Sequence, residues 1–182
     1  MATVKGKKKT VTIWGFVGIL VIMAWLLMPV TQAAAETKIV KYKVTNYITK
    51  MEVIPVFDVE GHVIGVFERR GVAILETGEV VAYLARGTFD LTKHHGPVQG
   101  YSQSTYKDGS TTVYEWQCIL SLLPEWKLGF IEGEGKYTKG TGRFTGIKGT
   151  VSFTGRYITP YSKETRGDLY VEATSIYTLP SQ

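Results

Sequence analysis

The stretch GFIEGEGKYTKGTGRFTGIKGTVSFTG, residues 129–155, decides the fold class, because it places eight glycines in 27 residues. Its spacing excludes two nucleotide-binding loops. Lys148 comes one place too late for a GxxxxGK[ST] loop, and Thr145 stands where a GxGxxG loop requires glycine. Glycines inside strands instead allow bulges, strong coiling and close approach of two backbones. A small closed barrel needs such bends, so the stretch favours a barrel of strongly curved strands.

We interpret residues 140–149 as a tight turn that joins two of these strands. The structural motif of this turn consists of Gly140, Gly142, Phe144, Gly146 and Gly149. We expect Phe144 to plug one end of the barrel. We expect Gly149 to begin the next strand, where a residue without a side chain permits a sharp bend.

Alternation of apolar and polar residues recurs on both sides of this turn, and it indicates strands. The Asp108-Gly109 pair is the strongest hairpin signal in the chain. The expected strands cover residues 38–48, 52–58, 62–68, 71–75, 80–91, 98–106, 111–119, 127–137, 147–158 and 168–179. About eight to ten strands with short connections are typical of an antiparallel sandwich or a closed barrel. We favour the barrel, because closure removes exposed edges, and eight strands leave room for side chains or one small ligand.

The turn and its neighbours also resemble a known signature. Gly140-Thr141-Gly142-Arg143-Phe144, followed by Gly146, Gly149 and residues 150–155, resembles the allene oxide cyclase and dirigent barrel superfamily, as a bacterial-type secreted member. Residues 167–172 resemble the last strand of that superfamily. The likeness is specific over residues 127–179 and only topological over residues 36–126.

This resemblance implies an all-β fold with a single antiparallel, eight-stranded, lipocalin-like barrel, commonly assembled as a trimer. It also implies a largely apolar cavity that works without a metal or cofactor. Plant allene oxide cyclases direct a ring closure, and dirigent proteins direct radical coupling. The matched motif is structural and carries no plant catalytic residue onto this chain, so activity does not transfer with the fold.

Residues 1–35 have the pattern of an export signal. Lysines precede an uncharged apolar run over residues 11–30, and Ala33-Ala34-Ala35 supplies the small residues that signal peptidase requires. The alternative is an uncleaved apolar helix that anchors the chain, since about 20 apolar residues can span a bilayer. In both cases the positive end stays in the cytoplasm. We therefore expect residues 36–182 to form one exported barrel domain, periplasmic or extracellular and possibly tethered to the membrane.

The charge of the chain excludes one class of partner. The formal net charge is +5, but four of the 21 basic residues are lysines of the leader. The remaining 17 basic residues face 16 acidic ones, which leaves no electrostatic footprint for nucleic acid. Cys118 is the single cysteine, so we expect a buried, inert thiol without a disulfide. One cysteine and three histidines do not supply a zinc cluster, and we expect neighbouring His94 and His95 to point in opposite directions.

The candidate site residues are polar or aromatic side chains on strands that would face a cavity. Glu115 shares a strand face with Gln117, and a carboxylate inside a barrel could act as acid or base. The alternative places Glu115 in solvent and the intervening Tyr114 and Trp116 in the core. Tyr83 shares a face with Phe89, and its phenol could hydrogen-bond a ligand or could simply belong to the core. The predicted ligand-binding set is therefore Tyr83, Phe89, Glu115 and Gln117, with Glu115 as the candidate catalytic residue.

Three functions fit these features. The first is a cofactor-free barrel that binds a small, mostly apolar molecule. The second is a structural subunit of a cell-surface or membrane-associated assembly. The third is a cyclase or isomerase that steers a reactive intermediate inside the barrel, with Glu115 as its acid or base.

Overall fold

The computed structural model describes residue 2 and residues 36–123, 129–162 and 164–181. The leader expected over residues 1–35 therefore lies almost wholly outside the described residues and stays a prediction. In the described residues, no helix has the length and apolar character needed to cross a membrane.

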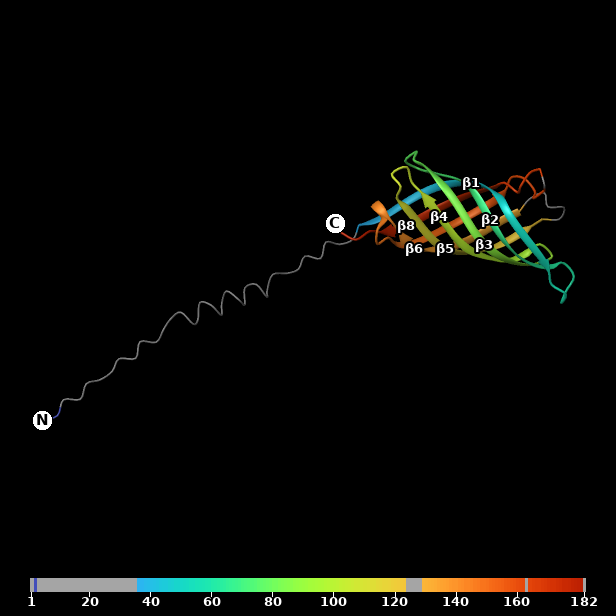
Figure 1. The fold of residues 1–182 in the computed structure, drawn as a ribbon, viewed down its shortest axis with the longest axis horizontal. Helices are drawn as coiled ribbons and strands as arrows, with labels where there is room; N and C mark the ends of the chain where they lie inside the picture. The colour runs from blue at the N-terminus through green and yellow to red at the C-terminus, as the bar shows by residue number, and fades with distance from the viewer. Residues whose placement is uncertain (1, 3–35, 124–128, 163, 182) are drawn as a thin grey trace. The chain divides into compact units, whose positions relative to one another are not determined.

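Eight antiparallel strands close into a barrel in which each strand pairs with its neighbour in the chain (Figure 1). The circle closes where β8 pairs with β1, for example through Val171 and Val44. The predicted closed barrel is thus confirmed, and sequence order equals spatial order around it. The strands are β1 (Thr37–Pro55), β2 (His62–Leu75), β3 (Val80–Thr92), β4 (His95–Thr105), β5 (Thr111–Leu122), β6 (Gly129–Gly140), β7 (Lys148–Tyr157) and β8 (Leu169–Thr178).

Two pairs of expected strands are single long strands, which corrects the sequence prediction. Residues 38–48 and 52–58 belong largely to β1, because a register shift between Ile48 and Lys50 bends the strand without ending it. Residues 62–68 and 71–75 join in β2, because Gly71 is a point of close approach and not a turn. A Cβ on Gly71 would lie only 1.9 Å from the Thr45 carbonyl oxygen of β1.

The barrel core consists of the inward-facing residues of these strands. One buried cluster combines Val44, Ala73, Val81, Leu169 and Val171 from four strands. This cluster packs against half-buried aromatic side chains, so apolar groups from both halves of the chain line this part of the interior.

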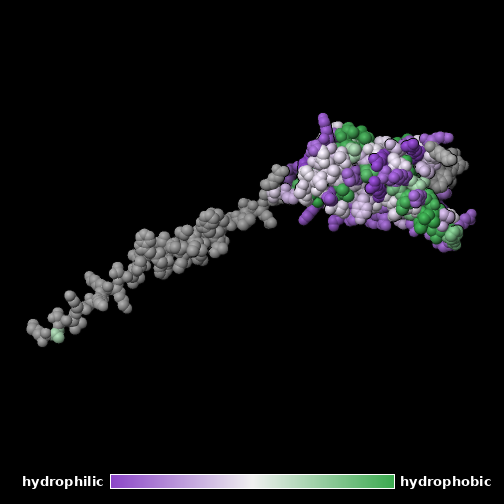
Figure 2. Space-filling view, viewed as in Figure 1, coloured by the Kyte–Doolittle hydropathy of each residue, from purple (hydrophilic) through white to green (hydrophobic). Residues whose placement is uncertain are grey.

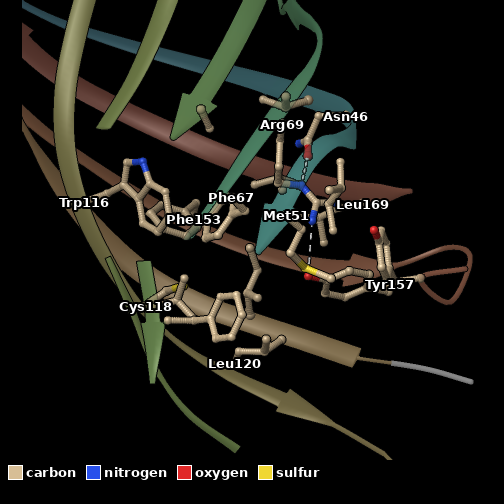
Figure 3. A pocket seen from close by; sticks show the side chains of 18 of the residues that line it. Asn46, Met51, Phe67, Arg69, Trp116, Cys118, Leu120, Phe153, Tyr157 and Leu169 are labelled. Carbon is tan, nitrogen blue, oxygen red and sulfur yellow. Dashed lines mark hydrogen bonds between the residues drawn. The ribbon is translucent and has the colours of Figure 1, made fainter. Parts of the chain in front are cut away.

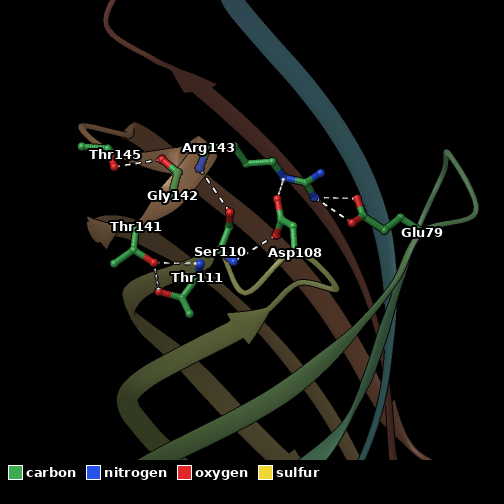
Figure 4. Close-up of polar contacts among 8 residues, drawn as sticks. All are labelled: Glu79, Asp108, Ser110, Thr111, Thr141, Gly142, Arg143 and Thr145. Carbon is green, nitrogen blue, oxygen red and sulfur yellow. Dashed lines mark hydrogen bonds and ion pairs between the residues drawn. The ribbon is translucent and has the colours of Figure 1, made fainter.

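The predicted tight turn over residues 140–149 is confirmed, and its centre is the short 3-10 helix η2 (Gly142–Phe144). Phe144 is buried, and its ring centroid lies 4.5 Å from that of Tyr106. The Arg143 guanidinium covers the Tyr106 ring. It also forms an ion pair with Glu79 at 2.7 Å (Figure 4). These contacts close the end of the barrel at which β1 starts and β8 ends, which we call the Phe144 end.

Hydrogen bonds attach the turn to the β4–β5 hairpin, as Figure 4 shows. The Arg143 backbone N–H donates to Ser110 Oγ at 3.1 Å, and the Thr111 N–H donates to Thr141 Oγ1 at 3.0 Å. Ser110 is buried although it lies in a hairpin loop, because the turn covers it. The predicted Asp-Gly hairpin therefore has a second role as the support of the turn.

Substitution of Gly149 tests whether the bend at the start of β7 requires glycine. The φ of Gly149 is +152°, and a Cβ there would lie 2.1 Å from the Ile176 carbonyl oxygen of β8. Gly78 also has a positive φ of +84°, but its Cβ would meet nothing within 4 Å. We expect Gly149→Ala to lower the free energy of unfolding by about 3 kcal/mol or more, against about 1 kcal/mol for Gly78→Ala. Urea denaturation of both variants measures the difference, and equal losses would contradict a steric requirement at Gly149.

Candidate functional site

The barrel interior contains a cavity of about 340 Å³ to which all eight strands contribute side chains (Figure 3). It extends from a layer of tyrosines to the end where Pro160 and Tyr161 of the β7–β8 loop line it, which we call the Tyr161 end. Most lining side chains are aliphatic or aromatic. They include Val44, Val63, Phe67, Phe89, Leu91, Val98, Trp116, Leu120, Ile131, Phe153, Leu169 and Val171.

Arg69 is the only charged side chain among the described residues that line this cavity. It is 5% exposed, and the inward phase of β2 places it there. Its Nε–H donates to Asn46 Oδ1, one Nη2–H donates to the Gly167 carbonyl oxygen, and one Nη1–H donates to Tyr157 Oη at 3.3 Å. Its guanidinium carbon also lies 5.2 Å from the centre of the Tyr157 ring. Arg69 therefore joins β1, β2, β7 and the β7–β8 loop at one side of the cavity.

Hydrogen-bonded hydroxyls form the inner wall. Tyr83 Oη lies 2.7 Å from Ser102 Oγ, which also accepts a hydrogen bond from the Trp116 indole N–H at 2.9 Å. Burial raises the pKa of Tyr83, and it raises the pKa of Tyr114 well above its usual value. Both phenols therefore keep their protons at neutral pH and can act only as neutral hydrogen-bonding groups.

A second hollow of about 410 Å³ lies on the other side of the tyrosine layer, toward the Phe144 end. Tyr42 and Tyr114 line both hollows. The second one is rich in hydroxyl groups, and some of them bond to each other, as Tyr137 does to Ser175 at 2.8 Å. Its charged lining residues are Lys38, Glu79 and Arg143, and Arg143 pairs with Glu79. The apolar cavity with Arg69 is therefore the better candidate for a ligand site.

The structure corrects two predicted site residues. Glu115 and Gln117 are exposed on the outer face of the barrel, so they do not line the interior, and the alternative that places Glu115 in solvent is confirmed. The reason is the phase of β5, in which Tyr114, Trp116 and Cys118 point inward and the residues between them point outward. The candidate catalytic carboxylate is therefore absent from the cavity, and no other carboxylate occurs among its described lining residues.

The other two predicted ligand-binding residues do line the cavity. Tyr83 and Phe89 point inward from β3, as the alternation of that strand indicates. Their role in binding stays a prediction. Cys118 is buried as expected, and burial raises the pKa of its thiol to about 11, which keeps it protonated and unreactive.

Sequence reasoning missed Arg69 and its partner Asn46. The alternation Phe67, Arg69, Gly71, Ala73 contains the necessary signal, since these residues share one strand face. The signal was hidden because Glu68, Arg69 and Arg70 form a charged run, which is typical of a solvated turn. In the structure Glu68 faces outward and Arg69 faces inward.

The histidines give no indication of a metal site. Among the described residues, no group of three or more His, Cys, Asp or Glu side chains is placed to hold a metal ion. His95 is exposed and its Nδ1 lies 2.9 Å from Ser121 Oγ. His94 lies in the turn before β4 with a φ of +70°.

His62 has a different environment, beside cavity-lining Val63 at the Tyr161 end. Its Nδ1 lies 2.6 Å from Asp58 and its Nε2 lies 2.7 Å from Asp90. Hydrogen bonds to these two carboxylates raise the pKa of His62 above 6.5, and the bond with His62 lowers the pKa of Asp58. The ring thus holds the β1–β2 loop against the end of β3.

Two solved structures are similar to this barrel. A conserved protein of unknown function from Rhodopseudomonas palustris, RPA1785, aligns with a TM-score of 0.53 and 10% identity, over 79% of this chain and 98% of that chain. The pterocarpan synthase dirigent protein PsPTS1 aligns with a TM-score of 0.45 and 13% identity, over 81% and 97%. The likeness to RPA1785, at 10% identity, shows a shared fold and nothing about function. The TM-score with PsPTS1 is below 0.5, so we draw no conclusion from that alignment. No family model and no curated protein match the chain.

The His62 bridge predicts a pH dependence of stability. Because its pKa is higher in the folded than in the unfolded chain, the stabilisation is complete below about pH 6.5 and is lost as the pH rises through the folded pKa. It is also lost in acid, when Asp58 becomes protonated. We expect His62→Gln to lower the melting temperature most between about pH 4 and 6 and least in alkali.

His95→Gln is the matched control, because His95 faces a hydroxyl and not a carboxylate. Thermal melts of both variants and the wild type across pH 4–9 give the comparison. A loss at His62 that stays constant with pH would contradict the bridge.

Proposed function

We propose that this protein is a cofactor-free barrel that binds a small, mostly apolar molecule in its interior cavity. The observation that supports the proposal is the cavity of about 340 Å³ inside a closed barrel with an almost wholly apolar lining. Cavities that bind small molecules measure about 300–1,000 Å³ and combine apolar walls with a few polar groups. Arg69, Asn46 and the Tyr83 hydroxyl are such groups.

The apolar walls would supply affinity, and the polar groups would supply orientation. Burial of a ligand's apolar surface is favourable by about 25 cal/mol per Å². The lining side chains come from a rigid, continuously paired sheet, so little ordering of the protein would accompany binding. A ligand of modest size could therefore bind without a metal or a cofactor.

Export belongs to the same proposal. It is supported by the pattern of residues 1–35, in which a basic segment, an apolar run and a small-residue cleavage site follow one another. The barrel would then act in the periplasm or outside the cell, as a bacterial-type secreted member of the allene oxide cyclase and dirigent superfamily.

A second candidate function, a homo-oligomeric subunit of a surface assembly, is favoured by the outer surface. The β1–β2 hairpin carries a patch of exposed apolar side chains, which Figure 2 shows at the lower right. The patch consists of Ile54, Phe57, Val59, Ile64 and Val66, and Phe57 is 98% exposed. Contact with a second copy would remove this surface from water. The cyclase or isomerase alternative required Glu115 as an acid or base inside the barrel, and Glu115 faces solvent.

Filling the cavity tests the binding proposal. Val98 lines the cavity from β4, and the next residue, Gln99, faces solvent. We expect Val98→Phe to weaken binding of the neutral apolar dye N-phenyl-1-naphthylamine at least about tenfold, because the new ring occupies the space that the dye requires. Gln99→Phe adds the same ring outside the barrel and should bind the dye as the wild type does. Equal dye affinity in all three proteins, measured by fluorescence titration, would contradict an interior site.

Native mass spectrometry of the protein expressed from the full chain in a bacterial host tests two points. It shows whether the leader is cleaved and whether a small molecule is bound. We expect the mass of residues 36–182, because signal peptidase would cut after Ala35, plus the mass of a co-purified small molecule. The Val98→Phe protein should lack this added mass. An intact leader would support the membrane-anchor alternative, whereas an empty wild-type barrel would count against the binding function. The same spectra report whether the patch produces oligomers.

A further inference from the structure

The cavity contains one chemical feature that an apolar ligand alone does not explain. The Arg69 guanidinium carries a positive charge, and it is removed from water at 5% exposure. A buried charge is costly unless an opposite charge compensates it. The described partners of Arg69 are an amide oxygen, a phenol and a backbone carbonyl, all of which are neutral.

The other arginines with hydrogen-bonded partners differ in this respect. Arg70, Arg86 and Arg143 each pair with a carboxylate at 2.7–3.0 Å, although their side chains are 44–66% exposed. Arg69 is the one buried arginine in the described part of the chain, and no ion pair involving it occurs there. The charge that most needs compensation therefore has only neutral partners within the described residues.

Arg69 also retains hydrogen-bonding capacity. A guanidinium has five N–H groups, and Asn46, Tyr157 and Gly167 accept from three of them. One further N–H on each terminal nitrogen has no acceptor among the contacts of the described residues. Two donors on adjacent nitrogens match the two oxygens of a carboxylate.

The position of Arg69 indicates how such a ligand would lie. Figure 3 shows Arg69, Asn46 and Tyr157 toward one side of the cavity and Cys118 and Leu120 toward the other. The charged group and two of its partners thus lie at one side, separate from the tyrosine layer, and the wall toward Cys118 and Leu120 is apolar. This arrangement fits a molecule with one charged head and an apolar body.

We propose that the natural ligand carries a carboxylate that pairs with Arg69, while its apolar part occupies the cavity toward Leu120. The inference rests on the proposed function and narrows it to apolar carboxylic acids. The bonds to Asn46 and Gly167 hold the guanidinium in place before the ligand arrives, so the ligand would not have to order it. Compensation of the buried charge would then accompany binding.

A matched pair of ligands tests the inference. Decanoate and 1-decanol have the same chain length and differ in the charge of the head group. At pH 8, where decanoate is ionised, we expect decanoate to displace N-phenyl-1-naphthylamine from the wild type at a concentration at least about tenfold lower than 1-decanol. We expect this ratio to fall to about one in Arg69→Met and to be partly retained in Arg69→Lys, which keeps the charge.

Arg70→Met is the control, because Arg70 is the next residue and faces outward toward Glu68. It should keep the wild-type ratio. A wild-type ratio near one would overturn the carboxylate inference, even if Arg69→Met fails to fold, and would leave the binding function intact. A ratio that is unchanged in a folded Arg69→Met protein would also overturn it. Failure of the dye and both ligands to bind the wild type would overturn the proposed function and the inference with it.

Discussion

The pairing of β1 with β8 is the constraint on which the rest of the structure depends. It runs from Thr37 opposite Thr178 to Asn46 opposite Leu169, and it turns a sheet with two edges into a barrel with none. Closure gives every strand one enclosed face and one exposed face. It therefore brings together side chains that are far apart in the sequence, such as Arg69 and the Gly167 carbonyl, which are 98 residues apart. The cavity exists only because this seam is closed.

Alternation along each strand allowed much of the fold to be predicted from sequence. In β3, polar Arg86, Thr88 and Asp90 mark the outer face, so the inward position of Tyr83 and Phe89 followed directly. In β5 the two faces differ less, because apolar residues occur on both of them. Two phases were therefore open from the sequence. The structure has the one that places Tyr114 and Trp116 inside and Glu115 in solvent, and pairing with β4 and β6 fixes it.

The candidate site was harder to predict than the fold, because its most informative residue is Arg69. Charged side chains usually face solvent, whereas this one is buried. Glu68 and Arg69 are adjacent in the chain and lie on opposite faces of β2. Outside the barrel, hydrogen bonds from Arg70, Arg86 and Thr49 lower the pKa of Glu68 to about 2. Inside, Arg69 is surrounded by neutral groups and apolar walls. The sequence shows that both residues are charged. Only closure of the barrel places Glu68 outside beside two arginines and Arg69 inside beside neutral groups.

The location of Trp116 has a practical consequence. Its indole ring lines the cavity while its N–H is bonded to Ser102, so the ring is fixed and lies where a bound molecule would touch it. Removal of a leader that ends at Ala35 would also remove Trp14 and Trp25. The intrinsic emission of the processed protein would then come from Trp116 and Trp126, and a shift in the Trp116 part would report occupation of the barrel without any added label.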